Sequence, residues 1–158
     1  MTEEQQEIVH SVDVAMPVGE VYNQWTQFED FTHFMRGVES VQQRDDTHTT
    51  WRIQVAGKEL SFDAEITEQI PDKRIAWKST DGRKHAGVVT FHRLDEDACR
   101  VTAQLTYEPA TFGEKLAGWL GVVDHRVKGD MTRFKGFIES KGAATGGYRG
   151  KVEAPPES

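Results

Sequence analysis

The sequence predicts an α+β fold in which a curved antiparallel sheet of seven strands is covered by one long C-terminal helix, with two short helices near the start. About a hundred residues alternate between apolar and polar positions, as expected of strands with one face in water. The segment from Thr111 to Lys141 instead repeats its apolar residues every three or four positions, which is typical of an amphipathic helix. A single helix lying across the apolar face of such a sheet would tend to enclose a pocket.

The chain opens with a strand and two short helices. Residues Val9 to Ala15 alternate as a half-buried strand does, and Met16-Pro17 ends the pattern. Proline suits the first turn of a helix, and apolar residues recur at helical spacing, so Pro17 to Gln27 is predicted to be helical. The second short helix rests on the spacing of Phe28, Phe31, Phe34 and Met35. Gly37 then ends it.

Six further strands are predicted between Val38 and Pro109, where the two-residue period returns between turn signals such as Gly57-Lys58 and Pro71-Asp72. The residues of one parity are apolar: Trp51, Ile53 and Val55; Leu60, Phe62, Ala64 and Ile66; Ile75 and Trp77; Val89 and Phe91; Val101, Ala103, Leu105 and Tyr107. The intervening positions are mostly polar, which favours an antiparallel sheet over a parallel one that is buried on both faces.

The long helix is predicted to begin at the capping box formed by Thr111 and Glu114. Four glycines in its first two thirds each cost about 1 kcal/mol relative to alanine, so a kink or break is expected around Gly118 to Gly121. Gly142 is expected to end the helix, because glycine readily adopts the backbone conformation that follows a helix C-terminus. We therefore predict one domain over residues 1–142, followed by a flexible C-terminal tail over 143–158 that is rich in glycine and proline.

Composition restricts the classes of partner. The chain has 158 residues and a formal charge of −7, with 26 acidic and 19 basic side chains, so nucleic acid is not expected as a partner. The single cysteine, Cys99, allows no internal disulfide, and no residues have zinc-ligand spacing, so no metal or cofactor is predicted. The acidic N-terminal start is unlike a secretory signal, and no apolar run would span a membrane. The expected location is cytoplasmic.

Four segments carry a resemblance to a known family. They are VDVAMPV at 12–18, FEDFTHFM at 28–35, EQIPDKRIAW at 68–77 and RFKGFIE at 133–139. In these segments, and in its order of elements over about residues 7 to 141, the chain resembles the START-like, or SRPBCC, superfamily. The similarity is to its polyketide cyclase/dehydrase-like and coenzyme-Q-binding members. The resemblance implies a helix-grip fold with a cavity between sheet and terminal helix, used in relatives for lipids, polyketides or isoprenoid quinones.

The strand positions predicted to face inward, together with apolar residues of the long helix, are predicted to form the wall of a ligand-binding cavity. Its predicted members are Trp51, Phe62, Trp77, Gly87, Phe91, Tyr107, Trp119, Met131 and Phe134. Aromatic and methionine side chains suit planar or chain-like apolar ligands, and Gly87 would leave room in the wall. The alternative is that these residues fill an ordinary core.

Three functions remain open. The first is a carrier or presenter of a hydrophobic small molecule such as a lipid. The second is an enzyme of the polyketide cyclase/dehydrase type, for which His10, His85 and Tyr107 are the weak catalytic candidates. The third is a module that docks on an unidentified protein partner. A purely apolar cavity favours the carrier, convergent inward polar groups favour the enzyme, and a large exposed apolar patch favours docking.

Overall fold

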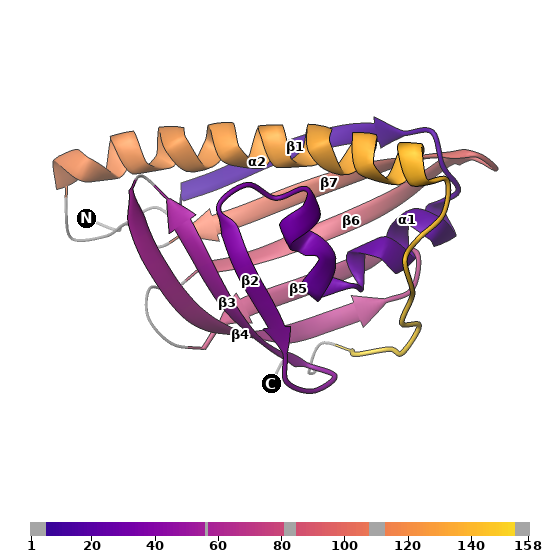
Figure 1. Ribbon diagram of the computed structural model, residues 1–158, viewed down its shortest axis with the longest axis horizontal. Helices are drawn as coiled ribbons and strands as arrows, with labels where there is room; N and C mark the ends of the chain where they lie inside the picture. Colours follow the sequence, from indigo (N-terminus) through magenta and orange to yellow (C-terminus); the bar gives the residue numbers. More distant parts are fainter. Residues whose placement is uncertain (1–5, 56, 81–84, 108–112, 154–158) are drawn as a thin grey trace.

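A computed structural model describes residues 6–55, 57–80, 85–107 and 113–153 (Figure 1). Its elements are, in chain order, β1 (Gln6–Val14), α1 (Val18–Trp25), the 3-10 helix η1 (Phe28–His33), β2 (Val38–Gln43), β3 (His48–Val55), β4 (Lys58–Ile70), β5 (Arg74–Ser79), β6 (His85–Asp95), β7 (Ala98–Tyr107) and α2 (Gly113–Lys141). The predicted capping box at Thr111, the turn at Asp81-Gly82 and the end of the tail lie outside the described residues.

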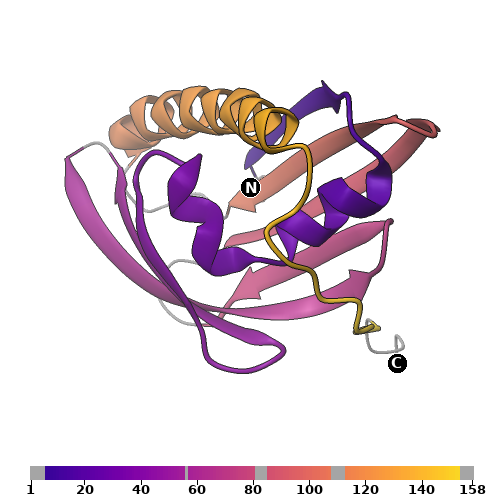
Figure 2. The same cartoon turned by 45° about the vertical axis from the view of Figure 1, so that its right-hand side comes forward.

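The seven strands form one antiparallel sheet in the order β1-β7-β6-β5-β4-β3-β2. The sheet curls, and α2 runs across the molecule along β1, while α1 and η1 lie on the same side of the sheet as α2 (Figure 2). The predicted α+β helix-grip fold is therefore confirmed. Because consecutive strands are joined mostly by short turns, β2 to β7 can pair as neighbours, and β1 closes the far edge against β7.

The short helices are amphipathic, and they bury their apolar faces against different parts of the molecule. Pro17 precedes α1, where its missing amide proton costs no helical hydrogen bond, and Val21 and Tyr22 are fully buried. Helix α1 packs on β6 and β7, whereas η1 packs on β2. The two helices thus cover part of the concave face of the sheet beside α2.

Aromatic side chains from these helices and α2 meet in the core. The ring of Trp25 lies 5.2 Å from that of Phe31 and 5.0 Å from that of Phe134, and Phe34 lies 5.1 Å from Phe134, measured between ring centroids. Edge-to-face arrangements such as that of Trp25 and Phe31 are favourable beyond their burial alone. This cluster fixes η1 against the C-terminal half of α2.

Helix α2 is continuous from Gly113 to Lys141, so the break expected around Gly118 to Gly121 is absent. A glycine costs only about 1 kcal/mol in a helix, which is less than the packing of one apolar side chain contributes. Met131, Phe134 and Ile138 are all buried on the face that the helix turns to the sheet. Within the described residues, no helix is long and apolar enough to cross a membrane.

The C-terminal segment 143–153 lies along α1 and reaches β4. The backbone of Val152 pairs with Gln69, and Thr145 contacts the buried amide of Gln24 through two hydrogen bonds of 2.9 and 3.1 Å. Arg149 forms an ion pair with Asp72 at 2.8 Å. The division into a domain over 1–142 and a flexible tail stays a prediction, and these contacts are what any motion of the tail would have to break.

Candidate ligand-binding site

A cavity of about 350 Å³ lies between the concave side of the sheet, η1 and the middle of α2. Its wall takes residues from β2 to β7, from both short helices and from Val123 to Met131 of α2. The wall is overwhelmingly apolar. A volume of this size falls within the range of ligand pockets, roughly 300 to 1,000 Å³.

Aromatic rings form the floor of the cavity on β3 and β4. Trp51 and Phe62 face each other across these strands in register, with nearly parallel rings 5.9 Å apart. Phe31 of η1 lies 5.8 Å from Trp51, and His85 of β6 lies edge-on to Phe62 at 4.6 Å. These contacts link the rings of η1, β3, β4 and β6 into a continuous aromatic surface, with the contact between His85 and Phe62 spanning β5.

Trp77 lies flat over Gly87, its partner on the neighbouring strand β6. A Cβ atom at position 87 would come within 2.3 Å of Cζ2 of the indole, closer than any real contact allows. The missing side chain of Gly87 therefore makes room for the indole of Trp77 rather than for a ligand directly. Because Trp77 lines the cavity, the position of its indole on Gly87 sets how deep the cavity is beside β5 and β6.

Polar groups in the wall are few, and most are already engaged. The indole nitrogen of Trp51 donates to the buried hydroxyl of Thr49 at 2.8 Å. Asp130 of α2 forms an ion pair with Arg133 and accepts the backbone N–H of Arg36 at 3.1 Å. Burial raises the pKa of Asp130, while Arg133 opposes that shift.

Two hydrogen-bond donors in the wall are less fully used. Arg126 of α2 donates through Nη1 to the carbonyl oxygens of Arg36 at 2.7 Å and Gln54 at 3.3 Å, and within the described part of the chain its other nitrogens have no partner. The buried Nε1 of Trp25 has no hydrogen-bond partner among the described residues. Within the same described part of the chain, no cluster of three or more His, Cys, Asp and Glu side chains is arranged to hold a metal ion.

The structure places the predicted wall residues in three groups. The first group lines the cavity: Trp51, Phe62, Trp77 and Met131. The second lies behind the wall: Gly87 beneath Trp77, Phe91 against Tyr22 at 5.3 Å, and Phe134 in the aromatic core. The third consists of Tyr107 and Trp119, whose side chains lie outside the described residues. The role of all nine residues in binding a ligand stays a prediction.

Of the catalytic candidates, His85 and Tyr107 are partners across β6 and β7, but the side chain of Tyr107 lies outside the described residues. His10 lies apart from His85. His85 lines the cavity, whereas His10 of β1 bonds to Asp124 of α2 at 2.9 Å and takes no part in the wall. The two histidines therefore do not form one site.

Sequence reasoning did not nominate the aromatic residues of the short helices or the charged residues of α2. Trp25, Phe28 and Phe31 line the cavity. Their helical spacing was visible, but the place where η1 docks depends on the curl of the sheet. Arg126 and Asp130 are four residues apart and flank the apolar stripe, so a helical projection puts them at its border. That position was the only available signal for them.

Comparison with known proteins matches residues 14–136 to the family model described as polyketide cyclase/dehydrase and lipid transport. A curated relative, a 17.2 kDa uncharacterized protein from Streptomyces lincolnensis, is 52% identical over 146 residues, covering 92% of this chain and 97% of that protein.

Solved structures share the fold at lower identity. The Zhui aromatase/cyclase from a Streptomyces species aligns with a TM-score of 0.78 and 16% identity, covering 92% of this chain and 100% of that chain. A protein from Thermus thermophilus aligns with a TM-score of 0.74 and 21% identity, covering 87% of this chain and 100% of that chain. At such identities the likeness concerns the fold.

Proposed function

Because this chain belongs to the polyketide cyclase/dehydrase and lipid transport family, we propose that it binds an apolar small molecule in the cavity, as a carrier or presenter. The ligand class is lipid, isoprenoid or polyketide-like. The observation that carries the proposal is the 350 Å³ cavity with its aromatic floor on β3 and β4. An apolar wall binds by removing ligand surface from water, which needs no conspicuous sequence motif.

The energetics define a signature for this mode of binding. Each buried methylene group contributes about 0.8 kcal/mol, which tightens binding about fourfold. Lengthening a linear alcohol should therefore lower its dissociation constant about fourfold per carbon until the cavity is full. Beyond that length the gain should stop, because further methylenes stay in water.

The test combines retained and added ligands. Native mass spectrometry of protein purified from its own cells should show a bound apolar molecule. Displacement of the neutral fluorophore N-phenyl-1-naphthylamine by linear alcohols should show the chain-length dependence. If no ligand is retained and no alcohol displaces the fluorophore, the proposal is wrong.

A matched pair of variants locates the binding. Ala103 of β7 lines the cavity and is buried, so Ala103→Phe should fill part of it and weaken alcohol binding at least tenfold. Val9 of β1 is exposed, so Val9→Phe should leave binding unchanged. Circular dichroism checks that both variants fold. Equal binding by Ala103→Phe and the unaltered protein would place the ligand elsewhere.

A cyclase-type enzyme is the second candidate, and the observation that favours it is His85 in the cavity wall. In an aldol cyclisation a proton leaves carbon, the resulting carbanion attacks a ketone carbon, and the new alkoxide takes up a proton. Dehydration then removes a second carbon-bound proton and the hydroxyl as water, so a histidine that accepts and returns protons could serve as base and acid in both steps. Incubation with a poly-β-ketone thioester should then yield a cyclised product by mass spectrometry. The variant His85→Phe should lose this product while still binding linear alcohols.

A docking module has less support. The exposed large apolar side chains among the described residues are Val9, Leu94 and Val122, which lie on β1, β6 and α2. Single exposed residues of this kind are normal on a protein surface, whereas docking surfaces are contiguous patches.

A further inference from the structure

The cavity wall holds a cation that binding of a purely apolar molecule does not require. Arg126 projects from α2 into the wall beside Val123 and Val127. Its Nη1 atom is held by the carbonyl oxygens of Arg36 and Gln54, at 2.7 and 3.3 Å. These carbonyls belong to the loop before β2 and to the end of β3, so the guanidinium bridges three elements at the edge of the cavity.

Gly37 makes this placement possible. Its φ of +89° is a conformation that other residues rarely adopt, and a Cβ atom there would lie 1.8 Å from Nη1 of Arg126. The same Cβ would lie 2.7 Å from the carbonyl oxygen of Gln54. The backbone is thus shaped around the guanidinium, which holds it in one position before any ligand arrives.

The guanidinium of Arg126 has hydrogen-bonding capacity that its two carbonyl partners do not use. A guanidinium has five N–H groups, and among the described residues Nε and Nη2 of Arg126 have no hydrogen-bond partner. The Nε1 atom of Trp25 is also without one, but it is buried and has almost no accessible surface, so a ligand in the cavity would not reach it. A ligand that satisfies Nε and Nη2 of Arg126 must bring hydrogen-bond acceptors such as oxygen atoms.

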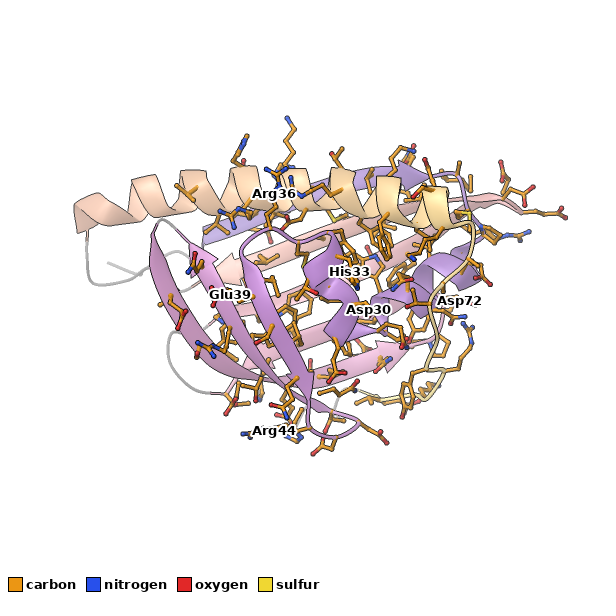
Figure 3. All side chains as sticks on the ribbon, viewed as in Figure 1. Asp30, His33, Arg36, Glu39, Arg44 and Asp72 are labelled. Atoms are coloured by element: carbon orange, nitrogen blue, oxygen red, sulfur yellow. The ribbon has the colours of Figure 1, made fainter. Side chains whose placement is uncertain are left out.

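The charge around Arg126 favours an anion. The only carboxylate of the described cavity wall is Asp130, which is paired with Arg133 and accepts the backbone N–H of Arg36. Arg36 also belongs to the wall and lies beside α2 (Figure 3). The described cavity wall therefore holds two arginines, Arg36 and Arg126, and one carboxylate that Arg133 already pairs with, although the whole chain has a net charge of −7.

We propose that the cavity selects amphipathic ligands whose apolar body ends in a carboxylate, and that Arg126 binds this carboxylate. The inference rests on the proposed function and adds the chemistry of the ligand's head. An arginine fork matches the two oxygens of a carboxylate, and charge-assisted hydrogen bonds are about twice as strong as neutral ones.

The experiment compares decanoate with two neutral analogues of the same chain length, 1-decanol and decanamide, by displacement of N-phenyl-1-naphthylamine at neutral pH. Decanoate should bind at least tenfold more tightly than either analogue. In Arg126→Gln this preference should disappear, while binding of decanol stays within twofold. Arg126→Lys should keep part of the preference, because it retains the charge without the fork.

The matched control is Arg52→Gln. Arg52 is an exposed arginine of β3 that pairs with Glu59 at 2.9 Å, outside the cavity wall, so its loss should leave the preference for decanoate intact.

The outcomes separate this inference from the proposed function. If the unaltered protein binds none of the three probes, the proposed function fails. If it binds all three equally, the cavity is used but the carboxylate site is wrong. If Arg126→Gln weakens decanol as much as decanoate, Arg126 only supports the wall, and the inference is again wrong. The comparison with decanamide uses the unaltered protein, so it stands even where a variant does not fold.

Discussion

Replacing Gly87 with alanine is expected to close part of the cavity while leaving the fold intact. The added Cβ would lie 2.3 Å from Cζ2 and 2.5 Å from Cη2 of Trp77, whereas carbon atoms in contact stay about 3.5 to 4.0 Å apart. The indole must therefore move by more than about 1 Å. Trp77 lines the cavity, so the open space toward which its ring can move is the one a ligand would use.

The cost to binding follows from the area that the ring would cover. A tryptophan buries about 200 Å², and if half of it displaces ligand from the wall, about 100 Å² of contact is lost. At about 25 cal/mol per Å² this is about 2.5 kcal/mol, or about 70-fold in the dissociation constant of 1-decanol. The cost to stability is smaller, because overpacking of about 1 to 3 kcal/mol is partly offset by the lower chain entropy of alanine, about 0.4 to 1 kcal/mol.

The assay pairs fluorophore displacement with unfolding in urea. Gly136→Ala is the matched control, since a Cβ on this exposed position of α2 meets nothing within 4 Å and should stabilise the helix by about 1 kcal/mol without changing binding. Adding Trp77→Leu to Gly87→Ala should restore much of the affinity, because the smaller side chain no longer fills the space. Binding of decanol within twofold of the unaltered protein by Gly87→Ala would refute the reasoning.

Three further perturbations test other parts of the structure. Thr145→Val removes a hydroxyl that accepts a hydrogen bond from Gln24 and donates one to Asp30 at 2.6 Å. The free energy of unfolding in urea should therefore fall by about 1 to 2 kcal/mol, and no change would indicate that the C-terminal segment is detached in solution. Burial raises the pKa of the Cys99 thiol to about 11. At neutral pH an aromatic disulfide reagent should therefore react with this thiol at least a hundredfold more slowly in the folded protein than in urea, and equal rates would contradict its burial. The raised pKa of Asp130 means that the folded state binds the proton of this carboxyl more tightly than the unfolded state does. The free energy of unfolding, relative to that of Asp130→Asn, should therefore decrease as the pH rises above 3.8. An increase would show that the ion pair with Arg133 outweighs burial.

The order and type of the elements were readable from local patterns. The alternation in β3 and β7 and the three-to-four spacing in α2 follow from the periods of strand and helix, so these segments appear where the sequence predicts them. The break expected near Gly118 did not occur, because a local glycine cost is small beside the packing of a long helix.

The sequence predicted which segments are strands more reliably than it predicted which alternate positions of a strand face inward. Strand β4 carries an irregularity between Ile66 and Glu68, after which the odd rather than the even positions turn inward, so Gln69 is buried and Glu68 pairs with Arg74. Phe91 and Phe134 do face inward, but they meet α1 and the aromatic core instead of the cavity. A strand pattern distinguishes inside from outside, and it does not distinguish a core from a cavity wall.

The amino-acid sequence by itself determined the antiparallel sheet, its covering helix and the apolar character of the face between them, because each depends on spacing along one segment. Only the tertiary structure decided where a cavity remains, how Trp77 lies on Gly87 and which cation reaches the wall. These features depend on the curl of the sheet and on the docking of η1 and α2, which bring together residues as distant as Gly37 and Arg126. Contacts across such separations follow from how the whole chain packs, and no local period encodes them.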